Sequence, residues 1–133
     1  MNPEQLRDLV RYRLAQASET LAEAVLLRDA GAFRGAVNRA YYAMFYALLG
    51  LLATRQLGTS KHSGAIALFD REFVRTGIFS PELSRALHLA FQRRQVHDYG
   101  EVVHADLNAA NESIEDAERF VAAIGSYLAP RVD

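Results

Sequence analysis

The stretch that decides the fold is FRGAVNRAYYAMFYALLGLLATR, residues Phe33–Arg55. Its large apolar side chains recur at helical spacing and cover more than half of the helix circumference. A helix that is apolar nearly all round belongs in the centre of a bundle, and a side made of small residues lets a second helix approach closely. That second helix belongs either to this chain or to a second copy of it. The small residues of this sector are Ala36, Ala43, Ala47 and Gly50.

Helical patterns flank this stretch on both sides. Asn2 is a good N-cap and Pro3 suits the first helical position, so a helix is expected to begin there and to end near Gly31. Ser80 and Pro81 form a second start signal of the same kind. The helices expected after the central one span about Ser63–Thr76, Ser80–His97 and Ala105–Leu128.

The connections between these helices are short, which indicates an antiparallel arrangement. The sequence shows no alternation of apolar and polar residues of the kind that is typical of a strand. With 133 residues, the chain is long enough to bury one core. The sequence therefore predicts an all-α, up-and-down bundle of four to five helices, forming a single domain over residues 1–133.

Composition excludes several classes of function. The net charge is −1, so nucleic acid could be held only by a local basic patch. Cysteine is absent, which excludes disulfides and zinc–thiolate sites, and no spacing of histidines and carboxylates predicts a metal site. We therefore expect no metal and no cofactor. The longest apolar run, Ala40–Ala53, is too short to span a bilayer, and the N-terminus does not resemble a signal peptide, so we expect a cytoplasmic protein without membrane contact.

A charged cluster, FQRRQVHDYG (Phe91–Gly100), lies near the expected end of the fourth helix. At about 100° per residue, Arg94 falls on the apolar stripe of that helix, within reach of an ion pair with Asp98. One interpretation is structural. In it, Arg94 pairs with Asp98, His97 interacts favourably with the helix C-terminus, and Tyr99 packs against the helix end.

The other interpretation of this cluster is catalytic. His97 would act as general acid or base, and Arg93 or Arg94 would hold the phosphate of an RNA substrate. A ribonuclease that works without a metal ion needs little more than these two groups beside one phosphodiester. Asp98 and Tyr99 would support them.

The polar connection TSKHSG, residues Thr59–Gly64, is a second candidate site. In a structural interpretation, Ser60 or Ser63 is the N-cap of the following helix. Alternatively, Ser60, Lys61, His62 and Ser63 bind phosphate or a nucleotide, because their side chains would join the free N–H groups of a helix N-terminus. Lys61 is the only lysine of the chain.

Other polar and aromatic residues are interpreted structurally. Tyr41, Tyr42 and Tyr46 recur at helical spacing and are expected in the core or an interface. His88 is expected in solvent on the outer side of its helix. The acidic residues of the last helix are expected on a solvated face: Glu112, Glu115, Asp116 and Glu118.

Four segments together resemble the HEPN family of small prokaryotic all-helical proteins. The resemblance covers nearly the whole chain and implies a HEPN-like helical bundle, usually a homodimer. Proteins of this family are often encoded beside a minimal nucleotidyltransferase. The four segments are NRAYYAMFYALLGLL (Asn38–Leu52), SKHSGAIALF (Ser60–Phe69), FVRTGIFSPEL (Phe73–Leu83) and RQVHDYG (Arg94–Gly100).

Ribonuclease members of that family carry an arginine, four to six residues, and a histidine that is often followed by any residue and a tyrosine. His97, Asp98 and Tyr99 match the second half of this motif. Arg93 leaves three intervening residues and Arg94 leaves two, so the arginine spacing departs from the ribonuclease motif. The chain instead resembles an Arg-x-x-x-Asp-Tyr variant of the family, through Arg94, Asp98 and Tyr99.

The resemblance and this spacing together imply a nucleotide- or RNA-binding module that is the partner of a minimal nucleotidyltransferase. Two alternatives stay open. One is a metal-independent endoribonuclease toxin of a toxin–antitoxin pair. The other is a purely structural dimerisation domain.

Overall fold

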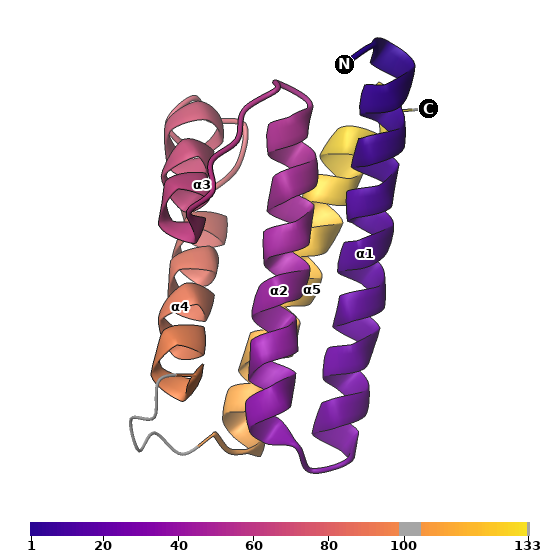
Figure 1. Ribbon diagram of the computed structural model, residues 1–133. Coiled ribbons are helices and arrows are strands. Elements are labelled where there is room, and N and C mark those ends of the chain that lie inside the picture. Colours follow the sequence, from indigo (N-terminus) through magenta and orange to yellow (C-terminus); the bar gives the residue numbers. More distant parts are fainter. Residues whose placement is uncertain (99–104, 133) are drawn as a thin grey trace.

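The computed structural model describes residues 1–98 and 105–132, and every regular element in these two ranges is helical. Three long helices pack side by side in Figure 1: α1 (Pro3–Asp29), α2 (Phe33–Ala53) and α5 (Leu107–Val132). The all-α bundle predicted from the sequence is confirmed.

Two shorter helices, α3 (His62–Phe69) and α4 (Pro81–Asp98), cover another flank of α2 (Figure 1). A π-helical turn, η1 (Asp70–Val74), continues directly from α3. The third expected helix therefore keeps nearly its predicted length but changes its hydrogen-bond register at Asp70. Because α2 contacts all four other α-helices, it occupies the central position predicted for it.

The beginning of α1 follows from local sequence. The Asn2 side chain accepts a hydrogen bond from the Gln5 N–H at 2.8 Å, and the Gln5 side chain accepts one from the Asn2 N–H at 3.1 Å. This reciprocal pair is a capping box, and Pro3 occupies the first helical position. After the helix, Gly31 adopts a φ of +80°, which favours glycine and allows the chain to turn into α2.

The small-residue side of α2 packs against α1. A Cβ atom at Gly50 would lie 3.2 Å from Arg13 Cβ and 3.7 Å from the Val10 carbonyl oxygen, so the two helices approach closely here. Ala43 and Ala47 are fully buried in the same helix. The sequence left open whether this sector meets the same chain or a second copy, and in the structure it meets α1 of the same chain.

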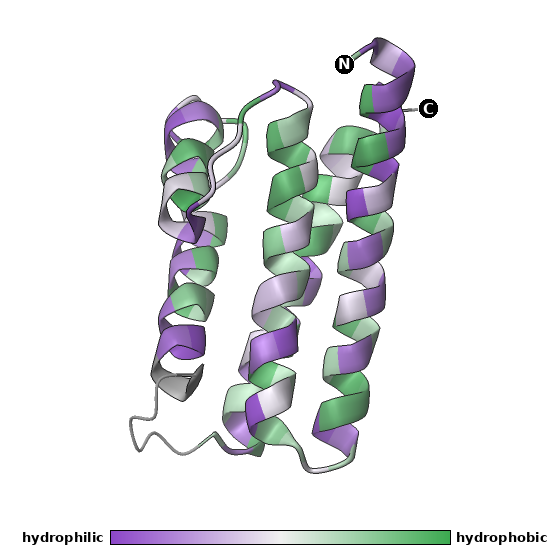
Figure 2. Cartoon of the chain, in the orientation of Figure 1, coloured by the Kyte–Doolittle hydropathy of each residue, from purple (hydrophilic) through white to green (hydrophobic). Residues whose placement is uncertain are grey.

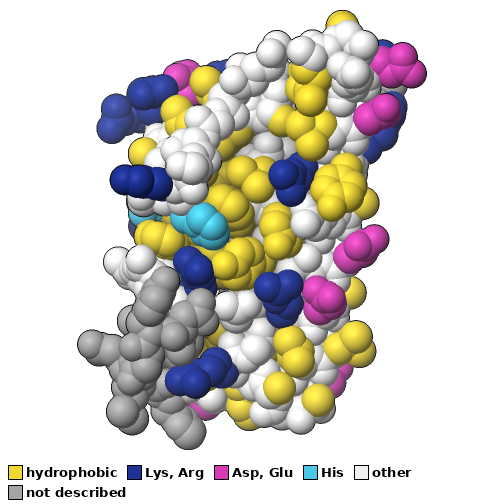
Figure 3. Space-filling view, viewed as in Figure 1, with side chains coloured by type: hydrophobic (Ala, Val, Ile, Leu, Met, Phe, Trp, Pro, Cys, Tyr) yellow, Lys and Arg dark blue, Asp and Glu magenta, His cyan; other side chains and the backbone are white. Residues whose placement is uncertain are grey.

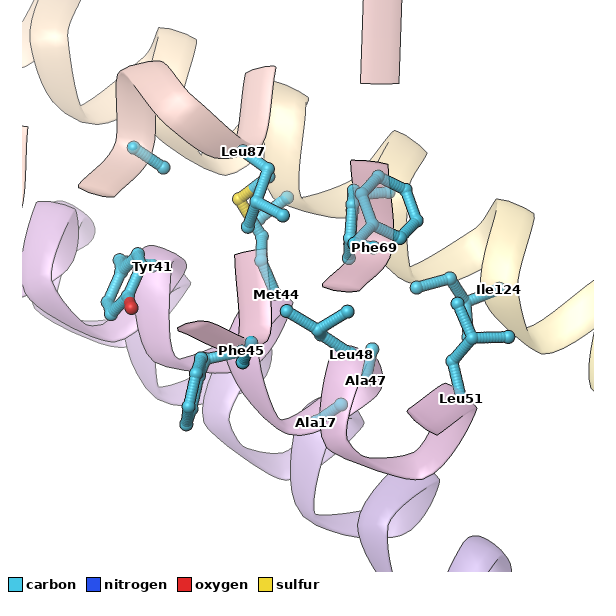
Figure 4. Close-up of a cluster of buried hydrophobic side chains, with 14 of the residues drawn as sticks. Ala17, Tyr41, Met44, Phe45, Ala47, Leu48, Leu51, Phe69, Leu87 and Ile124 are labelled. Atoms are coloured by element: carbon cyan, nitrogen blue, oxygen red, sulfur yellow. The ribbon is translucent and has the colours of Figure 1, made fainter. Parts of the chain in front are cut away.

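The large side chains of α2 form the centre of the core. Figure 4 shows Met44 and Leu48 of α2 close to Leu87 of α4 and Phe69 of α3, and Ile124 reaches the same core from α5. Figure 2 shows the corresponding pattern, because α2 is coloured largely as hydrophobic, whereas α1 alternates between hydrophilic and hydrophobic residues. Among the described residues, no helix combines the length and the apolar composition that crossing a bilayer requires.

Candidate functional site

The structure joins one residue from each of the two predicted sites. Arg94 of α4 extends over α2, with its Cζ atom 5.6 Å from the centroid of the Tyr41 ring and 5.3 Å from that of the Tyr42 ring. His62, the first residue of α3, reaches the same aromatic side chains, and its Nδ1 lies 2.6 Å from the Tyr41 hydroxyl. We call Tyr41, Tyr42, Phe45, His62 and Arg94 the aromatic–arginine cluster.

The His62 imidazole is fixed by aromatic packing. It stacks on Phe45, with ring centroids 3.9 Å apart and planes 11° from parallel, and meets Tyr42 edge-on at 5.9 Å. Burial lowers the pKa of His62, and the positive charge of Arg94 lowers this pKa further. The imidazole is therefore neutral at pH 7.

The Tyr41 hydroxyl determines which imidazole nitrogen carries the proton. Tyr41 is fully buried, and this burial raises the pKa of its phenol, although the charge of Arg94 acts in the opposite direction. A buried hydroxyl needs a hydrogen-bond partner, and in the described part of the chain that partner is His62 Nδ1; we assign Tyr41 as the donor, because one nitrogen of a neutral imidazole accepts. The proton of the neutral imidazole is then on Nε2, which can donate a hydrogen bond.

The lowered pKa of His62 gives an expected pH dependence. In an NMR titration the His62 midpoint should lie below the ordinary value of about 6.5. Because the unfolded chain then binds protons more readily than the folded one, this residue's contribution to stability is present above about pH 6.5 and is lost as the pH falls toward the folded pKa. The Arg94→Ala substitution should raise the midpoint, whereas Arg85→Ala, on an exposed part of α4, should leave it unchanged. A midpoint at or above 6.5 in the wild type would contradict this electrostatic account.

Arg93 points in another direction, toward α5. Its Nη2 lies 2.8 Å from Glu112 Oε2, and its Nη1 lies 4.0 Å from Asp116 Oδ2 and 3.4 Å from Ser113 Oγ. Adjacent residues of a helix are rotated by about 100° around its axis, so the side chains of Arg93 and Arg94 extend from different faces of α4. Of the two predicted catalytic arginines, the structure brings Arg94 to the cluster and holds Arg93 in ion pairs.

Of the acidic residues of the last helix that were expected on a solvated face, Glu112, Glu115 and Glu118 are exposed, and only Asp116 departs from the expectation. The Asp116 side chain is only 19% exposed, and both Asp116 and Glu112 pair with Arg93. His88 is exposed, as expected, and its Nε2 also lies 2.7 Å from Asp70 Oδ2. Ser84 Oγ donates to the other oxygen of Asp70 at 2.6 Å, so this carboxylate links η1 to α4.

The residues of the predicted phosphate loop divide between two environments. His62 turns toward α2, whereas Ser60, Lys61 and Ser63 remain exposed. The N-cap position of α3 is occupied by Lys61 with no side-chain cap, so neither serine caps the helix as predicted. The Thr59 hydroxyl instead accepts a hydrogen bond from the Lys61 N–H at 3.3 Å.

This face of the molecule is seen in Figure 3. A histidine lies among hydrophobic side chains, basic side chains are spread across the face, and most of the acidic ones lie toward α1. The sequence interpretation missed Tyr41 and Tyr42 as site residues, since their spacing predicted only packing. Their signal was the presence of hydroxyl-bearing rings within an otherwise apolar helix.

The remaining predicted residues are outside the described part of the structure. The backbone of α4 reaches Asp98, but the side chains of His97 and Asp98 and all of Tyr99 lie outside it. The ion pair between Arg94 and Asp98 therefore stays a prediction. Among the described residues, no group of three or more histidine and carboxylate side chains is arranged to hold a metal ion.

Comparison with known proteins agrees with this architecture. A crystal structure of TT1696 from Thermus thermophilus superposes with a TM-score of 0.76 at 21% sequence identity, covering 88% of this chain and 96% of that one. At this identity, the likeness concerns the fold. A UPF0332 protein from Thermotoga maritima is 40% identical over 120 residues, which are 90% of this chain and 91% of the relative.

Two further relatives come from Methanocaldococcus jannaschii. One, named "Putative toxin MJ0605", is 32% identical over 92% of this chain and 91% of its own length. The other, named "Putative toxin MJ0142", is 29% identical over 86% of this chain and 78% of its own length. The family model for the HEPN domain matches residues 10–127, so the chain belongs to the HEPN domain family.

Proposed function

We propose that this protein is a nucleotide- or RNA-binding module whose ligand occupies the aromatic–arginine cluster. The observation that carries the proposal is the contact of one guanidinium, that of Arg94, with the rings of both Tyr41 and Tyr42 beside the neutral imidazole of His62. Arginine binds phosphate through paired N–H donors, and aromatic rings accept stacked bases. The cluster thus offers a group for each part of a nucleotide.

The exposed edge of the cluster determines what a ligand could contact. Tyr42, His62 and Arg94 are each half-buried. Tyr41 is fully buried, and its hydroxyl holds His62 through the hydrogen bond to Nδ1. A second guanidinium, that of Arg39, lies 5.1 Å from the Tyr42 ring centroid. We infer that a base stacks at Tyr42 and that its phosphate is bound by Arg94, with the His62 Nε2 proton as an additional donor.

A second candidate function is a metal-independent endoribonuclease toxin, and the names of the two Methanocaldococcus jannaschii relatives favour it. In this version, His97 exchanges the proton and Arg94 holds the phosphate. Arg93 is the weaker choice, because its side chain points away from the cluster, toward Glu112 and Asp116 of α5. The short Arg94–His97 spacing supports binding over cleavage.

The homodimer and the nucleotidyltransferase partner belong to the same proposal. Their support is the family to which the chain belongs. The apolar surface of α2, for which the sequence left a second copy open as a partner, is largely covered by contacts within one chain. A purely structural dimerisation domain would bind neither RNA nor nucleotides at the cluster.

Removal of the proposed stacking ring tests the binding function. Replacing Tyr42 with alanine should weaken the binding of a short labelled single-stranded RNA by about tenfold, because stacking on an aromatic ring contributes about 1–3 kcal/mol per base. Fluorescence anisotropy measures the effect. Tyr12→Ala is the matched control, since Tyr12 is 60% exposed on α1 and also contacts an arginine, Arg13.

Two outcomes would change this conclusion. Equal affinity of the Tyr42→Ala variant and the wild type would reject the cluster as the binding site. RNA that is shortened in the presence of EDTA, and stays intact with His97→Ala, would make the protein the ribonuclease of the second candidate function.

A further inference from the structure

We propose that a separate pocket, at the end of the bundle where α1 begins and α2 and α5 end, binds a small phosphate monoester. The pocket encloses about 320 Å³. We call it the arginine pocket, because Arg7 of α1, Arg55 after α2 and Arg131 of α5 all line it. Leu6, Val10 and Tyr127 form its less polar walls.

The charge of the arginine pocket favours an anion. Three arginines from three parts of the chain line the pocket, and the described residues that line it include no carboxylate. Glu72 pairs with Arg55 at 3.7 Å, whereas Arg7 and Arg131 pair with no carboxylate in the described ranges. An anion in this pocket would be attracted by the positive charges of the lining arginines.

Two of the arginines are already held in position. The Arg55 guanidinium lies 4.3 Å from the Phe73 ring centroid and donates to the Glu72 carbonyl oxygen at 3.2 Å. The Arg131 guanidinium lies 3.8 Å from the Tyr127 ring centroid and donates to the carbonyl oxygen of the same residue. Ordering these long side chains in advance reduces the entropy lost when a ligand binds.

Arg7 differs from the other two. It is exposed, and its side chain makes no hydrogen bond or ion pair with any residue in the described ranges 1–98 and 105–132. Its donors are thus available to a ligand without breaking an internal contact. A phosphate offers three oxygens that match the planar fork of a guanidinium.

The size and charge of the pocket define the ligand. A volume of 320 Å³ is at the lower end of the range of about 300–1,000 Å³ that is usual for small-molecule sites. A phosphate monoester carries nearly two negative charges at neutral pH, whereas a diester carries one, so three arginines favour the monoester. Leu6 and the part of the Tyr127 ring that Arg131 leaves uncovered would contact its organic group.

The arginine pocket is distinct from the aromatic–arginine cluster. The two share no residue, and Thr54 at the pocket is twelve positions beyond Tyr42, or roughly 18 Å along a helix. The proposal therefore stands whether or not RNA binds at the cluster.

Calorimetric titration of the full chain tests the proposal, with inorganic phosphate, phenyl phosphate and diphenyl phosphate as probes in a phosphate-free buffer. Phenyl phosphate should bind more tightly than inorganic phosphate, because its ring contacts the apolar walls, and more tightly than the diester. Arg7→Ala should weaken phenyl phosphate by about tenfold, as expected for the loss of a hydrogen bond between charged groups. Arg75→Ala removes another exposed arginine and should have no effect.

The result that would overturn the proposal is equal affinity of the Arg7→Ala variant and the wild type, or no binding by the wild type. Preference for the diester would also overturn it. Arg7→Ala should leave RNA binding unchanged. A failure of the phosphate-binding proposal can therefore be told apart from a failure of the RNA-binding function proposed for the aromatic–arginine cluster.

Discussion

Replacing Phe69 with alanine is expected to lower the free energy of unfolding by about 3–5 kcal/mol. Phe69 is fully buried at the end of α3, with its ring centroid 6.3 Å from that of Phe73, 5.7 Å from that of Phe79 and 5.4 Å from that of Phe120. The substitution removes buried apolar surface, leaves a cavity and ends three aromatic contacts. Since natural domains have a stability of about 5–15 kcal/mol, the loss would be a large fraction of the total.

Urea denaturation followed by circular dichroism measures this loss. The control is Leu26→Ala, because Leu26 is 69% exposed on α1 and its replacement should change stability by less than about 0.5 kcal/mol. Similar losses in the two variants would mean that Phe69 is not at the centre of the core.

Local signals predicted most of the fold. The Asn2 cap and Pro3 determine where α1 begins, and the nearly continuous apolar surface of residues 33–53 required a central position for α2. The change to a π-helical turn at Asp70 was not predicted, because residue spacing gives the extent of a helix but not its hydrogen-bond register. The Asp70 carboxylate binds Ser84 and His88 of α4. Because these partners lie on another helix, local sequence spacing does not predict the contact.

The candidate site was predicted only in parts. The position of Arg94 on the apolar stripe indicated that its side chain lies against the bundle, and it does contact α2. His62 was included in a phosphate loop, but its approach to Tyr41 depends on how α3 packs against α2. No sequence pattern joins residues so far apart, and for this reason the two candidate sites were expected to be separate.

Replacing Arg94 with alanine is the second large effect that we expect. The variant should bind single-stranded RNA at least about tenfold more weakly, because a hydrogen bond between charged groups contributes about 1.5–3 kcal/mol. Arg94→Lys should recover only part of the affinity, since lysine keeps the charge but lacks the planar fork. The Arg94 guanidinium also packs over the Tyr41 and Tyr42 rings, so the melting temperature of each variant must be compared with that of the wild type.

The most direct measurement is therefore an anisotropy titration of one labelled RNA with the wild type, Arg94→Ala and Arg85→Ala at the same salt concentration. Arg85 is on the same helix but lines a different surface, together with Glu82 and Asp116. The account predicts binding by the wild type and by Arg85→Ala, and at least about tenfold weaker binding by a folded Arg94→Ala variant. Equal binding by all three proteins, or none by the wild type, would contradict it.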